Sequence, residues 1–524
     1  MIFITILTLI VAKALPVINT NLSTIHFTRI SSLVLFLSAI LSLQILKIES
    51  IGNGIGLYSG LFHISQITVF FEIFILIIGG IILIGWPLIC NSLSVEKVKT
   101  INKSLISNIE GTIYNKGIDY SIIILFSILG SILLLSSYDL ISLYLSIELQ
   151  SFGLYILSSL HRDSYSSTAS GLKYFLLGGL SSCIILLGIS LIYAYTGITQ
   201  YESLYLLNSS LISNIESISI GSLGGLNVGL ILIFIGLLFK ISAAPLHNWS
   251  PDVYDGTPTI VTTYLTIIPK LSILILMLEL QGSTITNIII SKTGLISIIN
   301  NFSLSYLLLI TSLLSLIIGS LLGLAQIKIK RLLAYSTISH IGFILLAISI
   351  NTSQSIDSFI FYILQYTLTN LNVFLIILAY SYLSKNSLKD INYINSFIGF
   401  FYSYPLLSLS FSICLFSMAG IPPLVGFFSK QFVLYAALQN GYYLISIIGI
   451  IVSVISASYY LKIVKLIMTP TDKEVDNNIT SYSYLSNLHS YLISSLTLFI
   501  LLFFINPSII LNSTQLLSLS LFYI

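Results

Sequence analysis

The stretch Phe239-Lys-Ile-Ser-Ala-Ala-Pro245 decides the fold, because it interrupts an apolar run that is too long for one ordinary membrane crossing. Proline removes a backbone donor and clashes with the preceding turn, so the helix within residues 225–254 should break or kink there. A second long run, residues 398–439, is interrupted in the same way by Ala419-Gly-Ile-Pro422-Pro423. Pro245 and Pro423 are 178 residues apart. This spacing predicts two copies of one broken helix.

The composition requires a membrane. Hydrophobic residues make up 56% of the chain, charged residues only 7%, and the mean hydropathy is +1.02. A soluble domain cannot bury that much apolar surface, and the continuous apolar runs exclude an outer-membrane barrel. Runs of about 20 residues, the length of a membrane-spanning helix, predict fourteen spans. They lie near residues 1–19, 30–46, 62–89, 120–137, 140–160, 170–196, 225–254, 257–281, 303–325, 332–351, 357–384, 398–439, 441–465 and 488–512.

The broken spans imply an internal repeat. Five spans separate the seventh from the twelfth, and five separate the fourth from the ninth, so the second copy must enter the membrane from the opposite side. The sequence therefore predicts an all-α polytopic protein with two inverted five-helix repeats, each containing a discontinuous helix. Four segments follow: three N-terminal helices and a loop in 1–119, the repeats in 120–281 and 282–468, and a loop and final helix in 469–524.

The distribution of charge predicts the orientation. Of the 21 Lys and Arg residues, fourteen lie in loops after odd-numbered spans and two in loops after even-numbered spans. The positive-inside rule places the odd loops on the matrix or cytoplasmic side and both termini on the other side. Frequent Ile, Phe, Tyr and Asn suggest an AT-rich, organellar genome.

Four lysines lie within apolar spans and are the strongest indication of function. A charge near the bilayer centre costs roughly 2.5–3.5 kcal/mol, so such residues usually mark an ion or proton pathway. They are Lys173, Lys240, Lys270 and Lys430. Glu148, in the middle of the fifth span, should be protonated or paired with a cation on a neighbouring helix, and Lys240 is the natural partner.

Each of these residues also has a simpler interpretation. Structural ion pairs hold helices together, and Lys173, near the start of its span, could reach the interface. His340 could relay protons or only hydrogen-bond between helices. His247, beside the first break and close to a loop, could be exposed to solvent. The role of Glu72 stays open.

Other classes of site lack support. Cys90, Cys183 and Cys414 have no metal-ligand spacing, so the sequence predicts no metal or iron–sulfur site. Neither a GxGxxG pattern nor a P-loop occurs, so no nucleotide or flavin site is expected. The net charge of +3 does not imply nucleic acid as a partner.

Five motifs between about residues 120 and 440 resemble the antiporter-like subunits of respiratory complex I. They contain Glu148, Lys173, the first break, His340 and the second break. The motifs are Ile147-Glu-Leu-Gln-Ser151, Gly171-Leu-Lys-Tyr-Phe-Leu-Leu-Gly-Gly179, Gly236-Leu-Leu-Phe-Lys-Ile-Ser-Ala-Ala-Pro-Leu-His-Asn-Trp-Ser-Pro-Asp-Val-Tyr-Asp-Gly-Thr-Pro258, Arg331-Leu-Leu-Ala-Tyr-Ser-Thr-Ile-Ser-His-Ile-Gly342 and Met418-Ala-Gly-Ile-Pro-Pro-Leu-Val-Gly-Phe-Phe-Ser-Lys430. Residues 91–119, 197–226 and the tail after Met468 match no motif of the family.

The resemblance implies a proton-translocating membrane-arm subunit of NADH:ubiquinone oxidoreductase. It implies that Glu148 and Lys240 interact in a first half-channel, that Lys270 connects to Lys430, and that Lys173 joins the same axis. Histidines at the positions of His340 and His247 lie near the connecting route in some members. NADH, FMN, iron–sulfur clusters and ubiquinone would bind elsewhere in the complex, and this chain would bind no cofactor.

The implied location is the mitochondrial inner membrane, with both termini in the intermembrane space. Other membrane-arm subunits, accessory subunits and phospholipids such as cardiolipin would be the partners. Two alternatives remain from the sequence: a subunit of a multisubunit cation/proton antiporter, and a membrane scaffold that pumps nothing.

Overall fold

The structure is a computed structural model of the chain. It describes residues 1–15, 24–47, 54–85, 103–213, 220–284, 304–383, 390–470 and 485–522. Within these ranges, ten helices are long and apolar enough to cross a membrane, and four shorter apolar helices accompany them. Each of the fourteen predicted spans contains one of these helices, so the predicted all-α polytopic class is confirmed.

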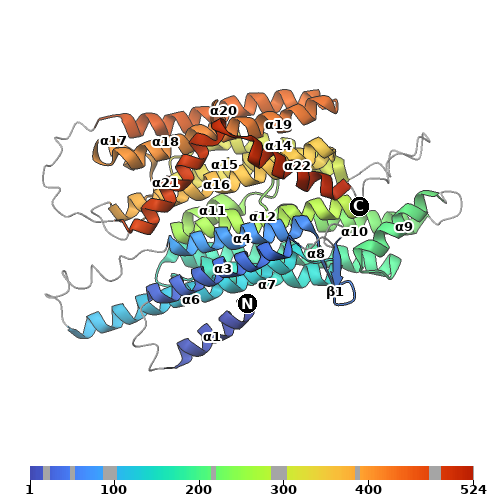
Figure 1. Cartoon of the computed structure of the whole chain (residues 1–524), viewed down its shortest axis with the longest axis horizontal. Helices are drawn as coiled ribbons and strands as arrows, with labels where there is room; N and C mark the ends of the chain where they lie inside the picture. The colour runs from blue at the N-terminus through green and yellow to red at the C-terminus, as the bar shows by residue number, and fades with distance from the viewer. Residues whose placement is uncertain are drawn as a thin grey trace.

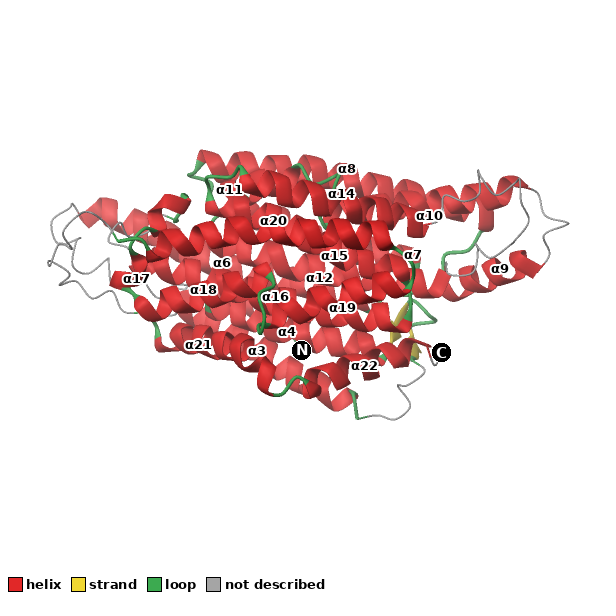
Figure 2. Ribbon diagram, turned by 90° about the horizontal axis from the view of Figure 1, so that it is seen from above, coloured by secondary structure: helices red, strands yellow, loops and turns green. Residues whose placement is uncertain are grey.

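The helices run side by side along the long axis of the molecule (Figures 1 and 2). The N-terminal group comprises α1 (Ile2–Ala14), α3 (Thr24–Ile45) and α4 (Gln66–Ile84). The first repeat comprises α6 (Lys103–Leu135), α7 (Leu140–Ser158), α8 (Tyr165–Thr196), α10 (Ile220–Lys240), α11 (Trp249–Gly256) and α12 (Thr259–Thr284). The second comprises α14 (Leu304–Leu324), α15 (Ile329–Ile350), α16 (Ser353–Leu383), α18 (Pro405–Ala419), α19 (Val425–Gln439) and α20 (Tyr443–Met468).

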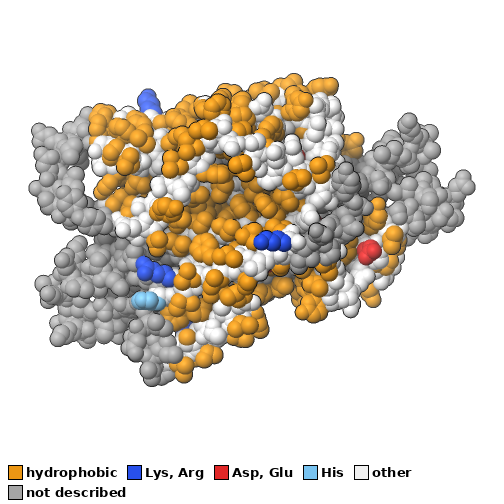
Figure 3. Space-filling model, in the orientation of Figure 1, with side chains coloured by type: hydrophobic (Ala, Val, Ile, Leu, Met, Phe, Trp, Pro, Cys, Tyr) orange, Lys and Arg blue, Asp and Glu red, His pale blue; other side chains and the backbone are white. Residues whose placement is uncertain are grey.

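Figure 1 shows the two halves of the chain as two adjoining groups of helices, blue to green below and yellow to red above. The N-terminal helices pack on the first repeat, where α3 and α4 both contact α6. On the second repeat, α21 (Asn487–Leu502) packs against α16 and α18. The face seen in Figure 3 carries mainly hydrophobic side chains and few charges where residues are described, as expected of a lipid-facing surface.

Each copy contains a matching joint, a pair of backbone hydrogen bonds at the equivalent place, as expected of an internal repeat. In the first copy, Leu140 N donates to Thr199 O at 3.0 Å and Tyr201 N donates to Tyr138 O at 3.2 Å. In the second copy, the pairs are Ile329 N to Asn392 O at 2.9 Å and Ile394 N to Ile327 O at 3.0 Å. Each joint ties the turn before the repeat's second helix to the segment after its third, so the predicted repeat is confirmed.

Both broken helices end in the same turn. Ser242 N donates to Phe239 O and Ala243 N donates to Leu238 O, each at 3.0 Å. In the second copy, Gly420 N donates to Ser417 O and Ile421 N donates to Phe416 O, each at 3.1 Å. This paired pattern is the Schellman motif, in which the residue after the helix adopts a left-handed conformation. Ser242 has φ +63° and Gly420 has φ +88°.

A cis peptide bond follows each of these turns, at Ala244–Pro245 and at Pro422–Pro423. The chain then re-enters a helix as α11 or α19. Pro245 therefore lies in the break between α10 and α11, and Pro422 and Pro423 lie in the break between α18 and α19.

Several elements were not predicted, because they are short or lie outside or at the ends of the predicted apolar runs. They are the hairpin of β1 (Ile55–Leu57) and β2 (Phe62–Ile64), α9 (Tyr201–Ser213), η4 (Ile394–Phe397), α17 (Phe400–Ser403), η5 (Phe503–Ile505) and α22 (Ser508–Phe522). The expectation of loops at 91–119 and 197–226 is wrong in part, because α6 begins at Lys103 and residues 197–226 contain α9 and the start of α10. Residues 91–102 lie outside the described ranges.

Candidate functional site

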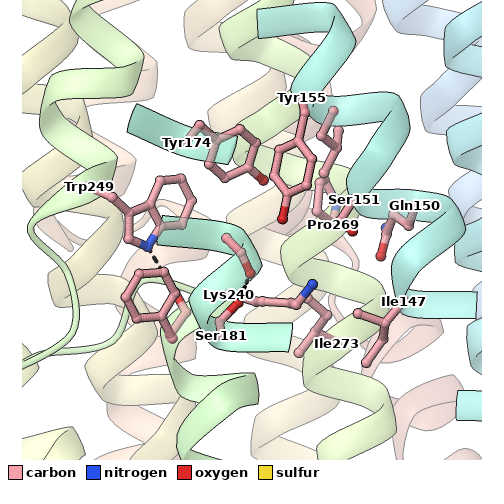
Figure 4. Close-up of a pocket in the computed structure, with 13 residues that line it drawn as sticks. Ile147, Gln150, Ser151, Tyr155, Tyr174, Ser181, Lys240, Trp249, Pro269 and Ile273 are labelled. Atoms are coloured by element: carbon pink, nitrogen blue, oxygen red, sulfur yellow. Dashed lines mark hydrogen bonds between the residues drawn. The ribbon is translucent and has the colours of Figure 1, made fainter. Parts of the chain in front are cut away.

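Lys240 is the last residue of α10 and lies beside a small internal cavity between α7, α8, α10, α11 and α12 (Figure 4). The cavity encloses about 20 Å³, which is room for one water molecule. Tyr155 and Tyr174 line it on one side, and Pro269, the residue before Lys270, lines it on another. The Tyr174 ring stacks on Trp249 with 4.9 Å between ring centroids, so aromatic side chains wall the cavity.

Glu148 lies on α7, one turn before Ser151, which lines the same cavity. Ser151 Oγ lies 3.4 Å from Glu148 Oε2 and can donate to it. Glu148 Oε1 and Lys240 Nζ are both buried and neither has a hydrogen-bond partner within the described chain. The predicted partners therefore lie near one cavity but do not form a direct ion pair in this state.

Lys270 is fully enclosed, with 1% of its surface exposed, in the middle of α12. Its ammonium group donates to Ser242 Oγ at 3.1 Å and to Thr337 Oγ1 at 3.2 Å, and it lies 5.4 Å from the centre of the Tyr254 ring. Ser242 is the left-handed residue that ends the first half of the broken helix. Lys270 thus connects the break of the first repeat to α15 of the second.

Lys430 lies in α19 and is also buried. Its ammonium group donates to the carbonyl oxygens of Met418 at 2.8 Å and Ala419 at 2.9 Å. These are among the last carbonyls of α18, which have no partner within the helix and carry the negative end of its dipole. The second break therefore forms a cation site for its own lysine.

Helix α15 spans the gap between these two lysines. Thr337 accepts from Lys270, and six residues later the Phe343 ring lies 5.9 Å from Lys430 Nζ. His340 lies between them, one turn after Thr337, with Nδ1 2.8 Å from Tyr362 OH and Nε2 3.4 Å from Tyr460 OH. His340 is thus hydrogen-bonded to tyrosines of α16 and α20, as one of the two interpretations held, and its role in a proton route stays a prediction.

Lys173 lies apart from this row. It is 57% exposed on α8 and pairs with Asp252 of α11 at 3.1 Å. Its membership of the pathway stays a prediction. His247, which could have been exposed, is in fact buried beside the break and faces Tyr335, with ring centroids 6.3 Å apart. Glu72 is half-buried on α4.

Sequence reasoning found the charged residues but missed their neutral partners. Ser242 and Thr337, the two acceptors of Lys270, both lie inside the motifs that carry the family resemblance, yet nothing in their spacing indicates this contact. Tyr155 and Tyr174 were not singled out, because tyrosine is frequent throughout the chain. Only the packed structure reveals which hydroxyl groups face the lysines.

Two inverted repeats, two broken helices and a buried row of titratable side chains define an antiporter-like membrane subunit. Residues 137–456 match the family model described as NADH:quinone oxidoreductase/Mrp antiporter, TM. The chain is 45% identical to NADH-ubiquinone oxidoreductase chain 2 of Rhizopus oryzae over 100% of both chains. It belongs to the chain 2 family of respiratory complex I subunits.

Solved structures with low sequence identity share the fold. A chain of respiratory complex I from Thermus thermophilus matches with a TM-score of 0.71 and 23% identity, covering 98% of this chain and 99% of that chain. A chain of the Mrp complex from a Dietzia species matches with a TM-score of 0.75 and 18% identity, covering 99% of this chain and 96% of that chain.

Proposed function

We propose that this chain translocates protons through a relay that runs from Glu148 and Lys240 through Lys270 and His340 to Lys430. The observation that supports it is a row of titratable side chains on packed helices in the otherwise apolar core. Lys240 shares its cavity with the residue before Lys270, Lys270 contacts α15 at Thr337, and α15 reaches Lys430. A scaffold would not need titratable groups on five helices along one route.

The relay works by electrostatics. A carboxylate that approaches a buried lysine strengthens the hold of the lysine on its proton, and withdrawal of the carboxylate weakens it. Movement of Glu148 relative to Lys240 would then drive a proton toward Lys270. Moving one proton against 100 mV requires about 2.3 kcal/mol, and each tenfold change in proton affinity supplies about 1.4 kcal/mol. Changes of about a hundredfold are therefore sufficient.

The chain would act within NADH:ubiquinone oxidoreductase of the mitochondrial inner membrane, with both termini in the intermembrane space. NADH oxidation and ubiquinone reduction, together with FMN and the iron–sulfur clusters, would belong to other subunits. The relatives named chain 2 support membership of that complex. The exposed apolar helix faces leave room for further membrane-arm subunits, accessory subunits and phospholipids such as cardiolipin.

The test uses the assembled complex carrying Glu148→Ala or Lys240→Ala. Both variants should lower proton pumping and coupled NADH–quinone turnover. Arg162→Ala, at an exposed cation outside the row, is the matched control and should pump normally. Full pumping by both core variants would exclude the relay.

Two alternatives predict other results. A subunit of a cation/proton antiporter, whose fold this chain shares, would purify without flavin- and iron–sulfur-containing partners. A scaffold would tolerate exchange of Glu148 and Lys240, because packing charges can be swapped, whereas a directional relay would stop.

A further inference from the structure

The start of α12 is bound to the second repeat by a group of four residues, which we call the α12 clamp. Asp390, in the segment after α16, accepts from Thr259 N at 3.0 Å through Oδ2 and from Thr259 Oγ1 at 3.0 Å through Oδ1. Lys330 donates to Asp390 Oδ2 at 2.6 Å and to Thr257 O at 2.8 Å. The carboxylate thereby caps the N-terminus of α12, where a negative charge is favourable.

The cation of the clamp is more deeply buried than those of the ion pairs nearby. The Lys330 side chain is 3% exposed and the Asp390 side chain 29%, whereas the Lys328 side chain is 38% exposed. Burial by itself raises the pKa of the Asp390 carboxyl, but the Lys330 ammonium and the two bonds from Thr259 outweigh burial, so the pKa lies below its usual value. Asp390 is therefore charged throughout the neutral range. Arg331, which pairs with Asp252 and Asp255, is 39% exposed.

Helix geometry connects the clamp to the relay. Thr259 and Lys270 are eleven residues apart on α12, which is three turns, so they share a face about 16 Å apart. Lys330 and Thr337 are seven residues apart on α15, which is two turns, so they also share a face about 10 Å apart. Helices α12 and α15 are thus linked at two places, at the clamp through Asp390 and Thr257, and at the hydrogen bond between Lys270 and Thr337.

We propose that Lys330 and Asp390 are positioning residues for proton transfer, because the α12 clamp sets the register in which Lys270 meets Thr337 of the opposite repeat. The clamp contacts no proton-carrying group itself. It fixes the first turn of α12 to α15, so any sliding or tilting of the two helices must first break the clamp. This inference rests on the proposed relay through Lys270.

The experiment measures coupled NADH–quinone turnover and protons moved per NADH in assembled complexes. Asp390→Asn preserves the shape of the side chain but places an amide nitrogen beside a donor. Lys330→Met removes the cation, and Lys330→Arg retains it. Lys328→Met is the matched control, because Lys328 pairs with Asp255, which keeps its bond from Arg331.

Asp390→Asn and Lys330→Met should assemble normally and lose coupled turnover by about tenfold, because displacements on the order of 1 Å cost up to about 10²-fold in transfer rates. Lys330→Arg should recover most of the loss, and Lys328→Met should behave as wild type. In a Lys270→Met background, Asp390→Asn should cause no further loss, because the clamp acts through Lys270.

Three results would overturn the proposal: full pumping by Asp390→Asn, an equal added loss in the Lys270→Met background, or failure of both clamp variants to assemble. The failure of the relay is distinguishable. If Lys270→Met pumps fully, the relay is wrong; if Lys270→Met is defective and Asp390→Asn is normal, only the clamp is wrong.

Discussion

The two broken helices end in the same type of backbone turn, but the lysine beside each turn makes different contacts. In the first, Lys240 precedes the turn, has no hydrogen-bond partner within the described chain and lies beside a cavity. In the second, Lys430 follows the turn and is bound by the carbonyl groups that the turn releases. Within the described residues, one lysine therefore lies unbonded beside a cavity, and the other donates to two backbone carbonyl oxygens.

The residue in the left-handed position explains part of this difference. A Cβ atom on Gly420 would lie 3.1 Å from Lys430 Cδ and 3.4 Å from its Nζ, so glycine lets the lysine approach the turn. Ser242 occupies the equivalent position in the first copy, and its hydroxyl group accepts from Lys270 instead. The residue at this left-handed position, Ser242 or Gly420, therefore helps to determine which lysine contacts each break.

Replacing each lysine by methionine should separate the two roles most clearly. Lys240→Met and Lys430→Met should both reduce proton pumping by about tenfold or more, as expected for loss of a positioned proton carrier. Lys430→Met should also lower the thermal midpoint of the complex, because each carbonyl left unpaired costs about 1–3 kcal/mol. Lys240→Met should not, since removal of an unpartnered buried charge is stabilising or neutral. A thermal loss confined to Lys240→Met would contradict the comparison.

Gly420→Ala should be the next largest effect. A left-handed conformation costs a residue with a Cβ atom about 1–2 kcal/mol, and the new methyl group would displace Lys430. We expect a lower thermal midpoint and weaker pumping, measured on the purified complex. Gly441→Ala is the control, because Gly441 also has a left-handed φ of +82° but open space around an added Cβ atom, so it should carry the backbone cost and pump normally.

Removing the acceptors of Lys270 should have a moderate effect. A hydrogen bond to a charged group is worth about 1.5–3 kcal/mol, so Thr337→Val should slow coupled turnover several-fold without loss of assembly. Thr337→Ser keeps the hydroxyl group and should retain activity. If valine at this position pumps as well as serine, the hydrogen bond from Lys270 has no role in transfer.

The smallest expected effect is the change in thermal stability at acidic pH. Because the folded pKa of Asp390 lies below its usual value, the charged carboxylate stabilises the fold above the unfolded pKa of about 3.9. This contribution is lost as the pH falls through the folded pKa. The difference in thermal midpoint between wild type and Asp390→Asn should therefore be constant from pH 8 to about 5 and shrink below about pH 4. If this difference in thermal midpoint grew as the pH fell, the charged Asp390 carboxylate would not be stabilising the fold.

Much of the fold could be predicted because its signals are local. Apolar runs located the fourteen spans, and the two proline-containing breaks indicated the inverted repeat. The hairpin at residues 55–64 and helix α9 escaped prediction because they are short and lie outside, or at the edge of, the predicted apolar runs.

The candidate site was predictable only in its charges. A lysine in an apolar span is conspicuous because placing its charge in a bilayer is unfavourable, so Lys240, Lys270 and Lys430 were evident from the sequence. Ser242, Thr337 and Asp390 have unremarkable sequence contexts, because serine and threonine are common in these helices and Asp390 follows a polar stretch of sequence. Their importance depends on which segments meet, and those contacts join residues 28 to 131 positions apart.

The most direct test of the relay is the number of protons moved per NADH oxidised by an assembled, membrane-reconstituted complex carrying Lys270→Met. Lys270 is the link between the two repeats, so its loss should interrupt transfer even where Glu148, Lys240 and Lys430 are intact. We predict a ratio below that of the wild type measured in parallel. An unchanged ratio, with assembly and NADH oxidation intact, would contradict the relay.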